Sequence, residues 1–224
     1  MFDIYFIHGW GFDKSFWLPT SKYIKQNELI RSLFYLDLNF FGSNTKNKIN
    51  RDSKINIFIT HSYGFHWILE KKIDFIGLIN FFSAPSFINF QKNPKKAKVT
   101  LNLMIKKFES SPNFVLEEFY KNCGIKKKKI IGKINKKKLL KSLKDLSSKN
   151  YKDDFLKVND KILNVYATKD KIFDLSLEKL DFLTDSKKKY VLVNSNQHAF
   201  PFLQPKETAA IINSYLEKLK NEKF

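Results

Sequence analysis

The feature that most constrains the fold is a series of short apolar segments that alternate with helical patterns. The segments are nearly continuous in hydrophobicity, which is typical of strands covered on both faces of a parallel sheet. The pattern predicts strands over residues 2–7, 33–38, 55–60, 75–80, 162–167 and 190–193, and helices over 63–71, 175–183 and 205–219. Strand, turn, helix and strand in succession predict an α/β fold with a mostly parallel sheet flanked by helices.

The alternation stops between residues 86 and 160. This stretch has no convincing strand pattern, but apolar residues recur in it at helical spacing, for example over 99–108 and 114–123. A chain of 224 residues is long enough to bury one core. We therefore predict a single domain over 1–224, with a core at 1–85 and 161–224 and an inserted helical lid at about 86–160.

Ser62 lies in the sequence THSYGF, directly after a predicted strand and before a predicted helix. In a nucleophile elbow, a serine occupies such a tight strand-to-helix turn, and small residues are needed two positions before and after it. Gly64 meets this requirement, whereas Thr60 is larger than the usual residue. A serine that only caps the helix is the alternative interpretation.

Asp170 and His198 follow the last two predicted strands, in the order Ser, Asp, His that α/β-hydrolase triads have. A serine hydroxyl needs a base to remove its proton, and the base needs a carboxylate that orients it. Taken singly, Asp170 could cap the next segment and His198 could be an ordinary loop residue. Together they predict a triad of Ser62, His198 and Asp170.

The sequence His8-Gly9-Trp10-Gly11 follows the first predicted strand. Glycines let a backbone approach a reacting group closely, and acyl transfer needs N–H donors for its oxyanion. We predict these donors to be the backbone N–H groups of Trp10 and Tyr63, with a simple glycine turn as the alternative.

The remaining histidines, His61 and His66, are interpreted as packing or capping residues. The four histidines of the chain lack the acidic or cysteine companions of a metal site. The sequence has neither a P-loop nor a dinucleotide-binding fingerprint. We therefore expect no metal and no cofactor. The sequence identifies no substrate-binding residues.

The net charge of +19 is unevenly distributed, because residues 91–161 hold 21 lysines and 7 acidic residues. Such a charge is typical of proteins that bind nucleic acid, an anionic membrane or an acidic protein. The Lys-, Asn-, Ile- and Phe-rich composition of an AT-rich genome is the competing explanation. No nucleic-acid-binding motif and no apolar run of about 18 residues occurs. We therefore expect neither nucleic acid nor a membrane as partner.

Cellular location is predicted from two features. The single cysteine, Cys123, cannot form an internal disulfide, which suits a reducing compartment. The first residues, MFDIYFIHGWG, lack the basic segment and apolar stretch of a signal peptide. We expect a cytoplasmic monomer.

The residues now described resemble the α/β-hydrolase superfamily over essentially the whole chain. More narrowly, they resemble the pimeloyl-[acyl carrier protein] methyl ester carboxylesterases of biotin synthesis. The resemblance is carried by HGWGFDKSFW at 8–17, HSYG at 61–64, FFSAPSF at 81–87, FYKNCG at 119–124 and HAFPFLQP at 198–205.

This resemblance implies a serine esterase that forms a pimeloyl ester on Ser62, releases methanol and then admits water. It implies His198 as base and acid, Asp170 as its carboxylate, and Trp10 and Tyr63 as oxyanion donors. It also implies an acidic acyl carrier protein that meets the Lys-rich lid. A general short-acyl carboxylesterase or thioesterase is the alternative within the enzymes, and a basic binding module on a hydrolase scaffold is the alternative outside them.

Overall fold

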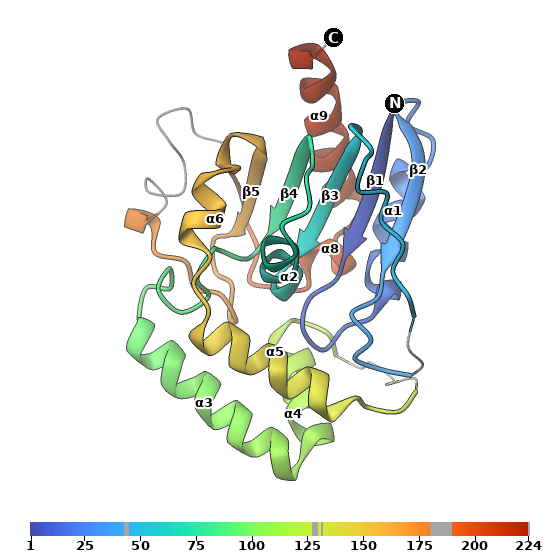
Figure 1. Cartoon of the computed structure of the whole chain (residues 1–224). Helices are drawn as coiled ribbons and strands as arrows, with labels where there is room; N and C mark the ends of the chain where they lie inside the picture. The colour runs from blue at the N-terminus through green and yellow to red at the C-terminus, as the bar shows by residue number, and fades with distance from the viewer. Residues whose placement is uncertain (43–44, 127–129, 131, 180–189, 224) are drawn as a thin grey trace.

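A six-stranded parallel sheet forms the centre of the molecule (Figure 1). The computed structural model describes residues 1–42, 45–126, 130, 132–179 and 190–223. The strands lie in the order β2-β1-β3-β4-β5-β6 and every pair is parallel. They are β1 (Phe2–Ile7), β2 (Ile30–Leu36), β3 (Asn56–His61), β4 (Gly77–Phe81), β5 (Ile162–Ala167) and β6 (Tyr190–Val193).

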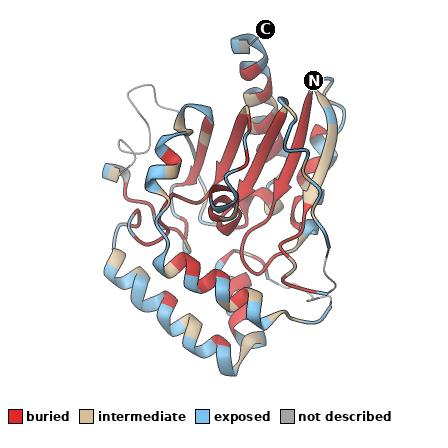
Figure 2. Cartoon of the chain, in the orientation of Figure 1, coloured by how far each residue is buried: buried red, intermediate tan, exposed pale blue. Residues whose placement is uncertain are grey.

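Helices cover both faces of this sheet. In Figure 1, α1 (Leu18–Ile24), α8 (Phe200–Leu203) and α9 (Pro205–Lys223) lie behind the sheet, and α2 (Tyr63–Lys71) and α6 (Lys152–Leu156) lie in front. The strands β1, β3 and β4 are consequently buried along their whole length, whereas the edge strands β2 and β6 are mostly half-buried (Figure 2). Short 3-10 helices at Lys14–Trp17, Asn159–Lys161 and Leu177–Lys179 complete the helical elements of the described residues.

The insertion between β4 and β5 forms a helical layer at the carboxyl ends of the strands (Figure 1). It consists chiefly of α3 (Pro94–Ser110), α4 (Pro112–Asn122) and α5 (Lys136–Ser148). Each helix turns apolar residues inward, and Phe108, Leu116 and Leu139 are fully buried in the same hydrophobic cluster as the sheet. Asn93 and Asn135 accept backbone N–H bonds at the starts of α3 and α5, as N-cap residues do.

The register brings the ends of neighbouring strands to one level. Ile7 of β1 lies opposite Thr60 of β3, and Asn80 of β4 lies opposite Asn164 of β5. The loops that follow these strands therefore leave the sheet side by side, under the inserted helices. This is the edge at which open parallel sheets bind their ligands.

The predicted mostly parallel sheet with flanking and inserted helices is confirmed. Three strands and the helix over 63–71 have the predicted bounds, and the second strand begins three residues before the predicted start. The helix predicted over 175–183 is wrong at its start, because Leu175 forms a β-bridge with Gln91 of the insertion. Residues 180–183 lie outside the described residues, as does the lysine run 127–129.

Among the described residues, no helix combines the length and the apolar character that crossing a membrane requires.

Candidate active site

Ser62 occupies a strained turn between β3 and α2. Its φ of 51° and ψ of −121° lie in a region that non-glycine residues rarely adopt. The backbone N–H of Ser62 donates to the Phe81 carbonyl at 2.9 Å, which holds the turn against the end of β4. Its side chain makes no capping hydrogen bond to α2. The capping interpretation is therefore wrong, and the geometry is that of a nucleophile elbow.

Gly64 allows α2 to begin against the end of β1. A Cβ atom at this position would lie 2.8 Å from the carbonyl oxygens of both Ile7 and His8. Such a contact is too short for any side chain, so the small residue predicted here is required. Thr60, the larger residue before the turn, is fully buried, and its hydroxyl donates to the Ile79 carbonyl at 3.4 Å.

Asp170 and His198 are brought together from the loops after β5 and β6. The Nδ1 atom of His198 lies 2.6 Å from Oδ2 of Asp170, and both residues are buried. The other carboxylate oxygen of Asp170 accepts the N–H groups of Ile172 and Phe173. Asp170 thus closes its own turn with one oxygen and orients His198 with the other.

The second ring nitrogen of His198 is available for a proton transfer. Its Nε2 atom is buried and has no hydrogen-bond partner among the described residues. The His198 ring packs 4.8 Å from the ring of His61, the neighbour of Ser62. Ser62 and His198 are not hydrogen-bonded to each other, which is common for such pairs before substrate binds. His61 and His66 also bury an Nδ1 atom without a partner among the described residues, so the bond to Asp170 is what distinguishes His198.

The predicted oxyanion donors belong to two segments that meet at this turn, the start of α2 and the loop after β1. Tyr63 is the first residue of α2, so its N–H has no acceptor within the helix. Gly9 precedes Trp10, and a Cβ on Gly9 would lie 3.0 Å from Cβ of Ser62. The loop after β1 therefore passes directly beside Ser62. The same segment also forms a hydrogen-bonded turn, in which the Phe12 N–H donates to the Gly9 carbonyl at 3.3 Å, so the glycine-turn interpretation is compatible with this close approach.

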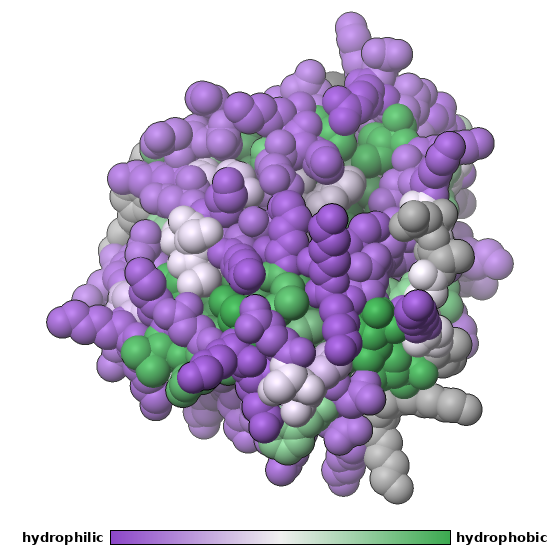
Figure 3. Space-filling model, turned by 60° about the horizontal axis from the view of Figure 1, so that its bottom comes forward, coloured by the Kyte–Doolittle hydropathy of each residue, from purple (hydrophilic) through white to green (hydrophobic). Residues whose placement is uncertain are grey.

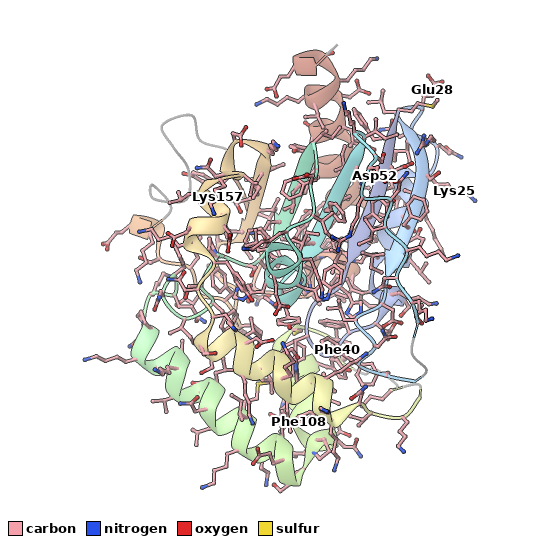
Figure 4. The ribbon with its side chains drawn as sticks, viewed as in Figure 1. Lys25, Glu28, Phe40, Asp52, Phe108 and Lys157 are labelled. Atoms are coloured by element: carbon pink, nitrogen blue, oxygen red, sulfur yellow. The ribbon has the colours of Figure 1, made fainter. Side chains whose placement is uncertain are left out.

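The side chains of Trp10 and Tyr63 both form hydrogen bonds to helix α5 of the insertion. Trp10 Nε1–H donates to the Leu139 carbonyl at 3.0 Å, and the Tyr63 hydroxyl donates to Asp145 at 3.1 Å, both on α5. Burial and then Asp145 raise the pKa of Tyr63, which keeps the phenol protonated as a donor. Phe108 of α3, labelled in Figure 4, packs edge-on to Trp10 with 5.8 Å between ring centroids.

His61 and His66 pack in the core, as predicted, but neither caps a helix. His61 shares a hydrogen bond of 2.8 Å between its Nε2 atom and the His198 carbonyl, and burial lowers its pKa well below the usual value. It is therefore a neutral donor that supports the loop of His198. His66 likewise donates from Nε2 to the Ala84 carbonyl at 2.9 Å.

His66 makes the stability of the fold sensitive to acid. Burial lowers the pKa of His66 to about 4, so between about pH 6.5 and 4 the unfolded chain binds a proton that the folded chain does not. The free energy of unfolding should then fall as the pH is lowered through this window, by about 2 kcal/mol between pH 7 and 5. In His66→Gln, the side-chain amide N–H replaces the ring N–H as donor to the Ala84 carbonyl, and the glutamine side chain does not titrate.

Urea unfolding of both proteins at pH 7 and 5 measures this contribution. The variant should lose about 2 kcal/mol less on acidification than the wild type. An identical loss in both proteins would contradict the assignment of this proton uptake to His66.

A cavity of about 790 Å³ leads from Ser62 to the surface between the inserted helices. Its wall is largely apolar and includes Trp10, Phe87, Leu101, Met104, Phe119 and Leu143. Sequence reasoning assigned none of these side chains to a cavity wall, because an apolar pattern predicts a buried face without showing what the face encloses. The described residues hold no cluster that could bind a metal ion.

Lysines outnumber acidic residues in the lining of this cavity, which has five lysines beside Glu118, Asp170 and Asp174. Lys96, Lys169 and Lys171 are exposed and have no ion-pair partner among the residues that the structure describes. Lys92 pairs with Asp174 at 2.9 Å, and Lys107 lies over the ring of Phe114. The opening therefore carries a local excess of positive charge.

Comparison with known proteins addresses the fold. No protein-family model and no curated protein matches the chain. Solved structures do match. An esterase from Thermogutta terrifontis has a TM-score of 0.71 at 15% identity and covers 98% of this chain and 90% of that one. MenH from S. aureus has a TM-score of 0.70 at 13% identity and covers 98% of this chain and 94% of its own. An esterase from Exiguobacterium antarcticum has a TM-score of 0.72 at 12% identity and covers 97% of this chain and 92% of its own.

The chain has the α/β-hydrolase fold. The likeness extends over nearly the whole of each protein, so the inserted helices are included in it. At such low identity the likeness establishes the fold alone.

Proposed function

We propose that the chain is a serine carboxylesterase with Ser62 as nucleophile, His198 as general base and acid, and Asp170 as the carboxylate that orients His198. The observation that carries this proposal is the arrangement around His198. One ring nitrogen is bound to Asp170, and the other is buried without a hydrogen-bond partner among the described residues. The His198 ring packs on His61, the neighbour of the strained Ser62. Esterases among the structural neighbours support the same class of reaction.

The residues divide the reaction into two steps. His198 Nε2 takes the proton of the Ser62 hydroxyl as its oxygen attacks the ester carbonyl, and the N–H groups of Trp10 and Tyr63 stabilise the oxyanion. The intermediate collapses, His198 protonates the departing alkoxide, and the alcohol leaves an acyl group on Ser62. Water then repeats the sequence with His198 as base and releases the acid and free Ser62. Asp170 stabilises the imidazolium in both steps.

The substrate that we propose is the methyl ester of pimeloyl-[acyl carrier protein], with methanol as the first product. A largely apolar cavity beside Ser62 suits a hydrocarbon chain, and the cationic opening suits an acidic carrier outside it. The HGWG and HAFPFLQP sequences support the same assignment by resemblance. A general short-acyl carboxylesterase or thioesterase is the second candidate, which the esterases among the structural neighbours favour.

Hydrolysis of methyl pimeloyl-carrier protein beside p-nitrophenyl butyrate separates the two candidates. Cleavage of both, with a much higher kcat/KM for the carrier ester, is the expected result. Cleavage of the small ester alone would keep the esterase and overturn the carrier-bound substrate.

Salt should affect the two substrates differently. Raising the ionic strength from 50 to 500 mM should lower kcat/KM for the carrier ester by about tenfold, since screening weakens the attraction between the lid and an acidic carrier. The small neutral ester should change by less than about twofold. An equal response of both substrates would leave genome composition as the explanation of the charge.

Reversing the charge of lysines at the cavity opening tests the same attraction without added salt. The double variant Lys96→Glu/Lys171→Glu should lower kcat/KM for the carrier ester, as salt does, and leave kcat/KM for the small ester unchanged. Lys25→Glu is the control, because Lys25 is exposed at the far end of the molecule from the lid (Figure 4). Figure 3 shows the lid side as mainly hydrophilic with apolar patches between, a surface on which both kinds of contact can form.

A further inference from the structure

His8 is a fully buried histidine whose role the catalytic triad does not explain. It is the last residue before Gly9 and Trp10 in the loop that follows β1. Its Nε2 atom accepts the backbone N–H of Leu38 at 3.0 Å and lies 3.6 Å from a carboxylate oxygen of Asp37. Because Nε2 accepts the Leu38 N–H, Nδ1 is the ring nitrogen that carries a proton.

The Nδ1–H of His8 donates to the Gly9 carbonyl at 2.9 Å. The same carbonyl also accepts the N–H of Phe12 at 3.3 Å. The Gly9 carbonyl and the Trp10 N–H belong to one planar trans peptide, in which they point in opposite directions. Fixing the carbonyl on one side therefore aims the N–H on the other.

The surroundings of His8 hold its ring in this orientation. Phe40, labelled in Figure 4, packs edge-on to the ring with 5.7 Å between centroids. Leu38 fixes the far nitrogen from the loop after β2. The donor on Nδ1 is thus held by two contacts that lie away from the reacting groups, while the peptide that it orients passes beside Ser62.

We propose that His8 is a positioning residue of the oxyanion hole: its Nδ1–H fixes the Gly9–Trp10 peptide so that the Trp10 N–H points at the developing oxyanion. This inference rests on the proposed esterase function. His8 exchanges no proton with the substrate. Its effect falls on the transition state, because the oxyanion forms only there.

Two substitutions distinguish the role of the Nδ1 donor of His8 from that of its Nε2 acceptor. The amide N–H of Asn reaches the position of Nδ1, so His8→Asn keeps the donor to Gly9 and loses the acceptor for Leu38. The amide oxygen of Gln reaches the position of Nε2, so His8→Gln keeps the acceptor and loses the donor. Tyr120→Phe is the control for general damage to the loop, because the Tyr120 hydroxyl donates to the carbonyl of Gly11, two residues after Gly9, at 2.5 Å.

The experiment measures hydrolysis of p-nitrophenyl butyrate and inhibition by an alkyl trifluoromethyl ketone, whose adduct with Ser62 carries an oxyanion. His8→Gln should lower kcat by about 10–100-fold with little change in KM, and should weaken inhibition by a similar factor. His8→Asn should stay within about fivefold of the wild type, and so should Tyr120→Phe, since neither disturbs the Gly9–Trp10 peptide.

An unchanged kcat in His8→Gln overturns the proposal, and so do two other patterns of loss. Equal losses in the Asn and Gln variants, or a larger loss in Asn, would mean that the Leu38 contact or simple packing explains His8. A loss in Tyr120→Phe as large as in His8→Gln would assign the effect to the whole loop. If His8→Gln does not fold, a loss above tenfold in a normally melting His8→Asn decides against the proposal, and activity near that of the wild type supports it. An inactive wild type would instead remove the proposed esterase function itself.

Discussion

Ser62→Ala is expected to lower kcat for ester hydrolysis by about 10⁵–10⁶-fold, because the variant has no hydroxyl to form the acyl-enzyme. The midpoint of thermal unfolding should change by only a few degrees. The Ser62 side chain makes no capping hydrogen bond, and alanine meets the same backbone strain as serine. Steady-state hydrolysis of p-nitrophenyl butyrate and a thermal melt measure both quantities.

Ser83→Ala is the matched control for this variant. Ser83 is also buried and follows the neighbouring strand β4, and its hydroxyl has no hydrogen-bond partner among the described residues. It should keep activity within about threefold of the wild type, as expected for a residue outside the triad. Full activity in Ser62→Ala would refute the triad, and equal losses in both variants would show damage to the loops.

Asp170→Asn is expected to lower kcat by about 10⁴-fold at pH 7. The amide keeps the shape of the carboxylate, but its NH₂ group can donate to His198 Nδ1 and so place the ring proton on Nε2. That tautomer cannot accept the proton of Ser62. The neutral amide also fails to stabilise the imidazolium, so the loss should appear in kcat more than in KM.

Asp174→Asn makes the same chemical change four residues further along the chain. Asp174 lines the cavity and pairs with Lys92 at the surface, so its loss should change kcat by less than about threefold. A similar decrease in both variants would mean that negative charge near the cavity matters, and that the bond between Asp170 and His198 has no special role.

The order and spacing of apolar strands and of the polar residues after them predicted the fold and the candidate site. Apolar strands, each followed by a polar loop, predicted the sheet and placed Ser62, Asp170 and His198 at one edge of it. The structure joins Asp170 to His198 at 2.6 Å and strains the backbone of Ser62. The parallel pairing of β5 and β6 explains why Asp170 and His198 meet, because loops after neighbouring parallel strands leave the sheet at the same edge.

What the sequence could not predict depends on contacts between distant elements. The bridge between Leu175 and Gln91 replaced the start of a predicted helix, because pairing with the insertion outweighed local helical spacing. The hydrogen bonds of His61 to His198 and of His8 to Gly9 and Leu38 depend on ring orientations that spacing does not encode. The cavity is likewise formed by faces of separate helices that meet only in the fold.

Covalent trapping tests the central claim most directly. The wild-type protein is incubated with a p-nitrophenyl alkylphosphonate, which transfers its phosphonyl group to an activated serine with release of p-nitrophenol. Intact mass spectrometry and peptide mapping then locate the adduct. One adduct per chain, on Ser62, together with loss of esterase activity and no adduct on Ser62→Ala, is the result that we predict. An adduct on another residue, or hydrolysis that continues after Ser62 is modified, would contradict the assignment of Ser62 as the nucleophile.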